Sequence, residues 1–87
     1  MKWVLKKQVR LEQSPSRVIL IDDRCADFYE CSESAYVLLK GLIKGATRKG
    51  LVQMLRDVYE LNEPEAVAQV EQCLSLLMAV GMLDEQA

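Results

Sequence analysis

The feature that most constrains the fold is a change of hydrophobic period at Cys31 and Ser32. Up to Cys31, apolar and polar residues alternate in short runs, as they do in strands that bury one face. From Ser32 onward, apolar residues recur every three to four positions, which is the spacing of amphipathic helices. Residues 28–35 therefore pass directly from a strand into a helix.

The first third of the chain predicts three antiparallel strands joined by turns. Residues 3–11 alternate and form the first strand, whereas residues 17–21 are apolar on both faces and suit a central strand. Residues 26–31 form the third strand, and polar turn clusters at residues 13–16 and 22–25 separate the three. Consecutive hairpins give the spatial order one, two, three, so the third strand lies at an edge of the sheet.

Three helices are expected after the strands. Their N-caps are Ser32, Thr47 and Asn62, and the helices run to about residue 44, to Tyr59 and to Gly81. The fold class is therefore α+β and resembles a winged helix-turn-helix, with a three-stranded antiparallel sheet followed by three helices. We expect a single domain over residues 1–87.

The third helix has an apolar arc that is wider than one line of helix contacts requires. At 100° per residue, its core stripe consists of Val67, Val70, Leu74, Leu77 and Met78. One flank of the stripe carries Gln69, Cys73, Leu76 and Val80. This flank is a candidate groove.

The composition excludes several kinds of site. The chain contains no histidine, which is the commonest general base and the commonest metal ligand. Cys25, Cys31 and Cys73 have no C-x-x-C spacing and follow no secretory signal, so they are expected to be free thiols in a cytoplasmic protein. No stretch approaches 18 apolar residues. We expect no metal, no cofactor and no membrane partner.

The charges are distributed unevenly, and this argues against nucleic-acid binding. All 11 basic residues lie within positions 1–56, whereas positions 57–87 carry seven acidic residues and no basic one. A winged helix that binds DNA needs Lys or Arg on its last helix to neutralise phosphates. The last helix here offers Glu65 and Glu71 instead.

Catalysis is not expected either. The serines have no histidine as a base partner, and the adjacent carboxylates Asp22 and Asp23 sit in a turn, where solvated charge is the ordinary interpretation. No glycine-rich phosphate loop occurs in the chain. The protein is therefore predicted to bind a partner without modifying it.

Peptide binding suits the expected architecture better. An extended peptide can add to an exposed strand edge through main-chain hydrogen bonds, while alternate side chains enter pockets below it. The candidate edge consists of Asp27, Phe28, Tyr29, Glu30 and Cys31, and the candidate opposite wall consists of Gln69, Cys73, Leu76, Leu77 and Val80. Phe28 and Leu77 are at the same time expected to be core residues.

The sequence also resembles a known family. The run Tyr29-Glu30-Cys31-Ser32-Glu33-Ser34-Ala35, followed by Leu38, Leu39 and Gly45, is similar to the Tyr-x-Leu-Asn-x-Ser/Thr-Ala helix start of PqqD-like proteins, the RiPP recognition elements. The ending with Gln69-Val70, Cys73-Leu74, Leu77 and Gly81-Met82-Leu83 resembles that family's Asp-Val…Leu-Leu…Leu…Gly-Leu-Leu pattern. Cys31 and Ser32 replace the family's Leu and Asn, and Gln69 replaces its acid.

The resemblance implies a non-catalytic domain that captures the leader region of a ribosomally synthesised precursor peptide. The leader would add as a strand between the third strand and the third helix, and would be presented to a modifying enzyme. A chain of this length resembles the leader-binding partner of a lasso-peptide leader peptidase, or PqqD itself, which works with a radical enzyme. The region after Ile21 lacks the glycine-containing turn expected of PqqD, which favours the lasso type.

Alternatives from other classes stay open at this point. The apolar flank of the third helix would also serve a structural adaptor or dimerisation module, in which it forms a subunit interface. A winged-helix nucleic-acid binder is the remaining alternative, despite the acidic last helix.

Overall fold

The computed structural model describes residues 2–15, 17–24 and 27–86. The strands are β1 (Lys2–Leu5), β2 (Val9–Ser14), β3 (Arg17–Asp22), β4 (Asp27–Cys31) and β5 (Leu83–Gln86). The helices are α1 (Glu33–Lys44), α2 (Arg48–Tyr59) and α3 (Glu63–Ala79). The predicted turn residues Ser16 and Cys25, and Ala26 at the start of the predicted third strand, lie outside the described residues.

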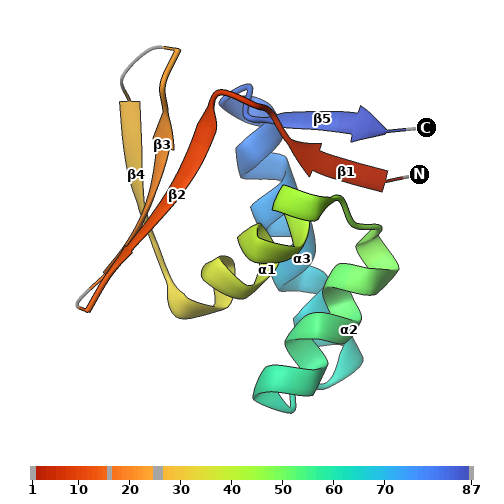
Figure 1. Cartoon of the computed structure of the whole chain (residues 1–87). Coiled ribbons are helices and arrows are strands. Elements are labelled where there is room, and N and C mark those ends of the chain that lie inside the picture. The colour runs from red at the N-terminus through yellow and green to blue at the C-terminus, as the bar shows by residue number, and fades with distance from the viewer. Residues whose placement is uncertain (1, 16, 25–26, 87) are drawn as a thin grey trace.

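A three-stranded antiparallel sheet in the order β2-β3-β4 precedes the three helices (Figure 1). This confirms the predicted α+β class and the predicted strand order. Strand β3 is central, with Val18 and Leu20 buried on its inner face, and β4 is an outer strand that passes through Ser32 straight into α1. The sequence switch at Cys31 and Ser32 therefore marks the junction of sheet and helices.

The single first strand expected over residues 3–11 is wrong, because the chain turns at Lys6. The Val9 amide donates to the Lys6 carbonyl (3.0 Å), and this turn separates β1 from β2. Beyond the turn, β2 pairs with β3, whereas β1 pairs with the C-terminal strand β5, which the sequence analysis did not predict. The Lys6 amide also donates to the Met82 carbonyl (2.9 Å) and so holds the turn against the end of α3.

The three predicted helix caps are confirmed. The Ser32 hydroxyl accepts a hydrogen bond from the Ala35 amide at the start of α1 (3.3 Å). Corresponding bonds run to Thr47 Oγ1 at the start of α2 (3.0 Å) and to Asn62 Oδ1 at the start of α3 (3.0 Å). Each cap satisfies one of the amides that the first turn of a helix leaves without a partner, and so fixes where the helix begins.

The core lies where the three helices meet the inner face of the sheet. Its buried residues include Leu20, Leu38, Leu39, Leu42, Leu51, Leu55, Ala66, Val70, Leu74, Leu77 and Met82. Val67 and Met78, which were predicted to lie in the core stripe of α3, are 40% and 42% exposed, and Ala66 is fully buried instead. The buried face of α3, which packs against α2, α1 and β5, is therefore rotated from the stripe that apolar spacing alone indicates. No helix within the described residues is long and apolar enough to cross a bilayer.

Candidate functional site

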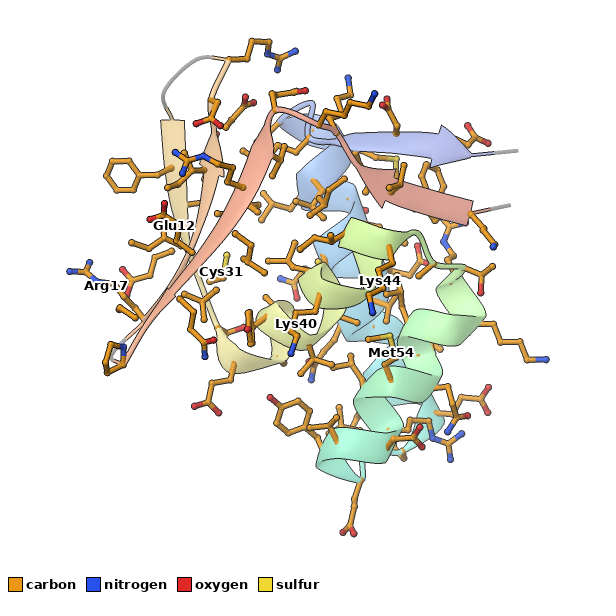
Figure 2. All side chains as sticks on the ribbon, viewed as in Figure 1. Glu12, Arg17, Cys31, Lys40, Lys44 and Met54 are labelled. Carbon is orange, nitrogen blue, oxygen red and sulfur yellow. The ribbon has the colours of Figure 1, made fainter. Side chains whose placement is uncertain are left out.

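A cleft with a volume of about 530 Å³ lies between β4, the first half of α1 and the second half of α3. The β4 side contributes Tyr29 and Cys31, and the α3 side contributes Cys73, Leu76 and Val80. In Figure 2 the Cys31 side chain points from β4 toward the helices, into the interior. The cleft therefore separates an outer strand from a helix that follows it by more than 30 residues in the sequence.

Alternation along β4 gives its side chains two different environments. Tyr29 and Cys31 are half-buried and face the cleft, whereas Phe28 and Glu30 are exposed on the outer face of the sheet, with Glu30 also bordering the rim of the cleft. Phe28 is 71% exposed, so the expectation that it belongs to the core is wrong. Within the described residues, no helix covers the outer face of the sheet (Figure 1), so no helix buries the phenyl ring of Phe28.

The hydrogen-bonding phase of the sheet is set at its β2 side. In an antiparallel pair, opposed residues alternate between positions that exchange main-chain hydrogen bonds and positions that do not. The Asp23 amide donates to the Gln8 carbonyl (2.9 Å), whereas the Val9 amide bonds back to Lys6 (3.0 Å). Hydrogen-bonded pairs recur every second residue, so Arg10 and Ile21, two residues along from Gln8 and Asp23, form the next such pair. The amide and carbonyl of Ile21 therefore point toward β2.

The same phase decides which backbone groups of β4 are free. Because Ile21 faces β2, its neighbour Leu20 faces β4, where it lies opposite Tyr29. The amide and carbonyl of Tyr29 are therefore directed into the sheet. Those of Phe28 and Glu30 point outward, along an edge that no other strand covers in the described part of the chain. An extended chain lying along β4 would meet two pairs of main-chain donors and acceptors.

The α3 wall of the cleft is mainly apolar and partly open to solvent. Leu76 is 59% exposed and Leu77 is 3% exposed, although both line the cleft. Leu77 therefore belongs to both the core and the cleft wall, whereas Leu76 offers apolar surface that the folded chain leaves uncovered. Gln69 and Gln72 line the end of the cleft that is nearer the start of α3.

The structure brings eight of the ten predicted site residues around this one cleft. These are Tyr29, Glu30, Cys31, Gln69, Cys73, Leu76, Leu77 and Val80. Phe28 lies on the outer face of β4 instead, and Asp27 is the first residue of that strand. Both residues still belong to β4, whose edge is open, so any role they have in binding a peptide comes from their position along this strand.

The sequence analysis missed the floor of the cleft. The floor and its rim are formed by Leu20, Ser32, Ser34, Ala35, Leu38, Leu39, Gln72 and Met82. The direct passage from β4 into α1 contained a signal for part of this set, because it forces the first turns of α1 to lie beside the strand. Nothing local in the sequence indicates that Met82 lines the cleft. This residue follows α3 and reaches the floor of the cleft only through the tertiary fold.

The two cysteines of the cleft are neutral at ordinary pH. Burial raises the pKa of the Cys73 thiol to about 11, and the proximity of Cys31 adds to the rise. Burial also raises the pKa of Cys31 above its ordinary value. A protonated thiol is a small apolar side chain and a poor nucleophile. Cys31 and Cys73 therefore extend the apolar lining of the cleft.

A second cavity lies beside the first, at the Cys31 end of β4. This cavity has a volume of about 460 Å³ and shares Glu30, Cys31 and Ser32 with the first. Its other walls come from the turn between β2 and β3, from α1 and from the end of α2, where Tyr59 lies. A chain that follows β4 past Cys31 would enter this cavity.

Comparison with known proteins identifies two solved structures with the same fold. No family model matches the chain, and a search of curated proteins finds no match. A structure described as lasso peptide synthetase B1 complexed with the leader peptide is 19% identical and has a TM-score of 0.81, covering 95% of this chain and 98% of that one. A second, described as TbiB1 in complex with the TbiA(beta) leader peptide, is 14% identical and has a TM-score of 0.83, covering 97% and 98%. The chain therefore has the fold of these two proteins, and its resemblance to PqqD-like RiPP recognition elements is confirmed as a likeness of fold.

Proposed function

We propose that this protein binds the leader region of a ribosomally synthesised precursor peptide as an added strand along β4, within lasso-peptide biosynthesis. The observation that carries the proposal is the open edge of β4 beside an apolar cleft. The edge supplies outward main-chain groups at Phe28 and Glu30, and the cleft supplies surface for alternate side chains of the peptide.

The chemistry of the cleft suits an uncharged, partly apolar peptide segment. A peptide side chain that faces inward beside Tyr29 would meet Leu76, Val80 and the protonated thiol of Cys73. The exposed apolar surface of Leu76 would then leave water, which favours binding by about 25 cal/mol per Å² of area removed. Main-chain hydrogen bonds hold any sequence, whereas these side-chain contacts discriminate between sequences.

Both structures that share the fold were solved with leader peptides, which supports a peptide as the ligand of this fold. A strand of five residues such as β4 offers an edge roughly 17 Å long, at about 3.3 Å per residue. We expect the affinity to fall in roughly the nanomolar to micromolar range, which corresponds to about 8–12 kcal/mol.

The bound leader would be delivered to a modifying enzyme, such as the leader peptidase of a lasso pathway, while this protein performs no chemistry itself. Two features support a non-catalytic role. The chain contains no histidine to act as a general base. The thiol of Cys73, which lies in the cleft, has a pKa raised to about 11 and is therefore a poor nucleophile at neutral pH.

The test uses the full chain and fluorescein-labelled synthetic peptides, made from the N-terminal regions of short reading frames that are found by inspecting the neighbourhood of the gene. Anisotropy titration is expected to give saturable binding. Hydrogen exchange is expected to slow at the Phe28 and Glu30 amides when the peptide binds, because both become donors in the added strand. Binding that leaves these two amides unprotected would contradict strand addition on β4.

Light scattering of the isolated protein provides the second arm of the test. A peptide-binding protein with a free cleft is expected to be monomeric. A stable dimer that is broken by a charge at Leu76 would show that the apolar wall is a subunit interface, and would contradict the proposal.

A further inference from the structure

The outer face of the three-stranded sheet carries two rows of side chains that end at the open edge of β4. The sheet register aligns Glu12, Ile19 and Glu30 in one row. It aligns Arg10, Ile21 and Phe28 in the other. In each row only the β3 residue has neighbours on both sides, whereas the β2 and β4 residues each have one neighbour within the described sheet, and of these two edges it is β4 that borders the cleft.

Glu30 ends its row without an ionic partner among the residues that the structure describes. At the other end of the same row, Glu12 accepts a hydrogen bond from Arg10 Nη1 (2.9 Å). Arg10 also pairs with Asp23 (2.8 Å between Nε and Oδ2). Among the described residues, no Lys or Arg nitrogen lies within 4.0 Å of a Glu30 oxygen.

Arg17 is the one other basic residue on this face of the described sheet, and it does not fill that role. It lies on β3 two residues before Ile19, which is the residue opposite Glu30. In Figure 2 the Arg17 side chain points away from the sheet into solvent. Glu30 is therefore a carboxylate at a sheet edge whose next cross-strand position is empty.

Phe28 ends the other row as the most exposed of the large apolar side chains in the described part of the chain, at 71%. Its cross-strand neighbour on β3 is Ile21, which is half-buried. On the other side of Phe28 the cross-strand position is empty within the described sheet. An added strand would place one of its outward side chains beside Phe28.

We infer that the peptide that adds to β4 carries, on its outward face, a basic side chain beside Glu30 and an apolar or aromatic side chain beside Phe28. The inference rests on the proposed function and specifies the sequence that the site selects. Directly opposed residues of antiparallel strands have Cβ atoms about 4.5–5.5 Å apart, so opposite charges and apolar pairs attract there. The two selected positions are two residues apart, because outward side chains alternate with inward ones.

Strand direction sets the order of the two residues in the peptide. Antiparallel pairing is the more stable per residue, and it reverses the order of β4. The peptide then reads, from its N-terminus, a basic residue, one inward-facing residue and an apolar residue. The inward-facing residue between them lies beside Tyr29 and enters the cleft.

The first experiment selects binders from a displayed library of random peptides, using the full folded chain as the target. Competition with the Leu76→Glu variant identifies the peptides that occupy the cleft. We expect these peptides to be enriched in Lys or Arg at one position and in apolar or aromatic residues two positions later.

The second experiment is a charge exchange on one selected peptide. Glu30→Lys is expected to weaken its binding roughly two- to fivefold, which is the range of an exposed cross-strand pair. Replacing the basic residue of the peptide by Glu should restore the affinity for Glu30→Lys while lowering it for the unchanged protein. Glu12→Lys is the matched control, because it makes the same change of charge on the same face but on β2, at the opposite edge of the sheet from β4.

The outcomes separate the inference from the proposed function. Cleft-binding peptides without a basic position, or equal effects of Glu30→Lys and Glu12→Lys, would overturn the inference while peptide binding stands. A selection that yields no peptide sensitive to Leu76→Glu would overturn the proposed function, and the inference with it. Circular dichroism and urea unfolding of both lysine variants check that the fold is retained.

Discussion

Tyr29 on β4 lies directly opposite Leu20 on the central strand β3, at a position where the two residues exchange main-chain hydrogen bonds. This relationship turns the Tyr29 side chain toward the cleft and its backbone groups toward the sheet. The residues on either side of it, Phe28 and Glu30, have the opposite arrangement, with side chains outside and backbone groups at the open edge. The proposed strand addition and the proposed side-chain selection in the cleft would thus involve different residues of β4.

Proline substitutions distinguish the two kinds of backbone position. Glu30→Pro removes an outward amide and leaves the β3–β4 ladder intact, as proline is tolerated where the amide of an edge strand faces outward. We expect the variant to fold and to bind leader at least about fivefold more weakly, since one hydrogen bond is worth roughly 0.5–1.5 kcal/mol and the ring also obstructs the approach of the peptide. Titration with labelled leader measures the effect.

Two further variants complete the proline test. Glu30→Gln separates the loss of charge from the loss of the amide. Tyr29→Pro removes a donor inside the sheet, so it should lower the free energy of unfolding as well as the affinity. Stronger loss of binding in a fully folded Tyr29→Pro than in Glu30→Pro would mean that the hydrogen-bonding phase assigned to β4 is wrong.

A charge on the cleft wall should weaken binding without unfolding the protein. Leu76 is 59% exposed, so Leu76→Glu should change the free energy of unfolding by no more than about 0.5 kcal/mol. In the proposed complex the peptide would cover the same side chain, so replacing it by a carboxylate should raise the Kd by about tenfold or more. Calorimetric titration with leader gives the Kd, and urea unfolding gives the stability.

Met78→Glu is the matched control for that variant. Met78 lies on the same helix, is 42% exposed and does not line the cleft. The Met78→Glu substitution should therefore leave the affinity for leader unchanged. Equal loss of binding in both variants would indicate a general effect of negative charge on α3, and an unstable Leu76→Glu would assign Leu76 to the core.

Gly81, which follows α3, should be sensitive to any side chain. Its φ of +74° lies in the left-handed region, where an L-residue with a Cβ is strained by roughly 1–2 kcal/mol. Gly81→Ala is thus expected to lower the free energy of unfolding by about that amount, measured by urea denaturation. Gly81→Asn should cost less, because asparagine tolerates this conformation better. Equal stability of the alanine variant would contradict the assigned turn.

The reactivity of Cys73 should depend on pH in a way that reports its burial. Its pKa of about 11 leaves little thiolate at pH 8, so alkylation by iodoacetamide should be much slower than for a free thiol of pKa about 8.5. The rate should keep rising by about tenfold per pH unit up to pH 10, where a free thiol has reached its plateau. Peptide mapping by mass spectrometry after timed quenching measures the rate at each pH.

Two comparisons complete the thiol experiment. In urea the alkylation rate of Cys73 should approach that of the free thiol, because burial is the cause of the shift. Bound leader should slow the reaction of the folded protein further, since Cys73 lines the cleft. Acceleration by leader would contradict the proposed position of the peptide.

The sequence by itself determined the features that depend on near neighbours. The change of period at Cys31 and Ser32, the caps at Ser32, Thr47 and Asn62, and the alternation along β4 all arise within a few residues, and the structure confirms each of them. The clustering of Gln69, Cys73, Leu76 and Val80 on one side of α3 also followed from helical spacing alone, and these residues do line the cleft.

The tertiary structure decided the features that depend on distant partners. The break at Lys6 and the pairing of β1 with β5 join the two ends of the chain. The burial of Ala66 in place of Val67 depends on how α3 is rotated against its neighbours. The outward direction of the Phe28 and Glu30 amides depends on which residue pairs of the sheet are hydrogen-bonded. The pairing of β2 with β3 determines that alternation, and β3 passes it on to β4. Local spacing encodes which face of an element is apolar, but partner and phase are chosen by the free energy of the assembled core, to which all of the elements contribute together.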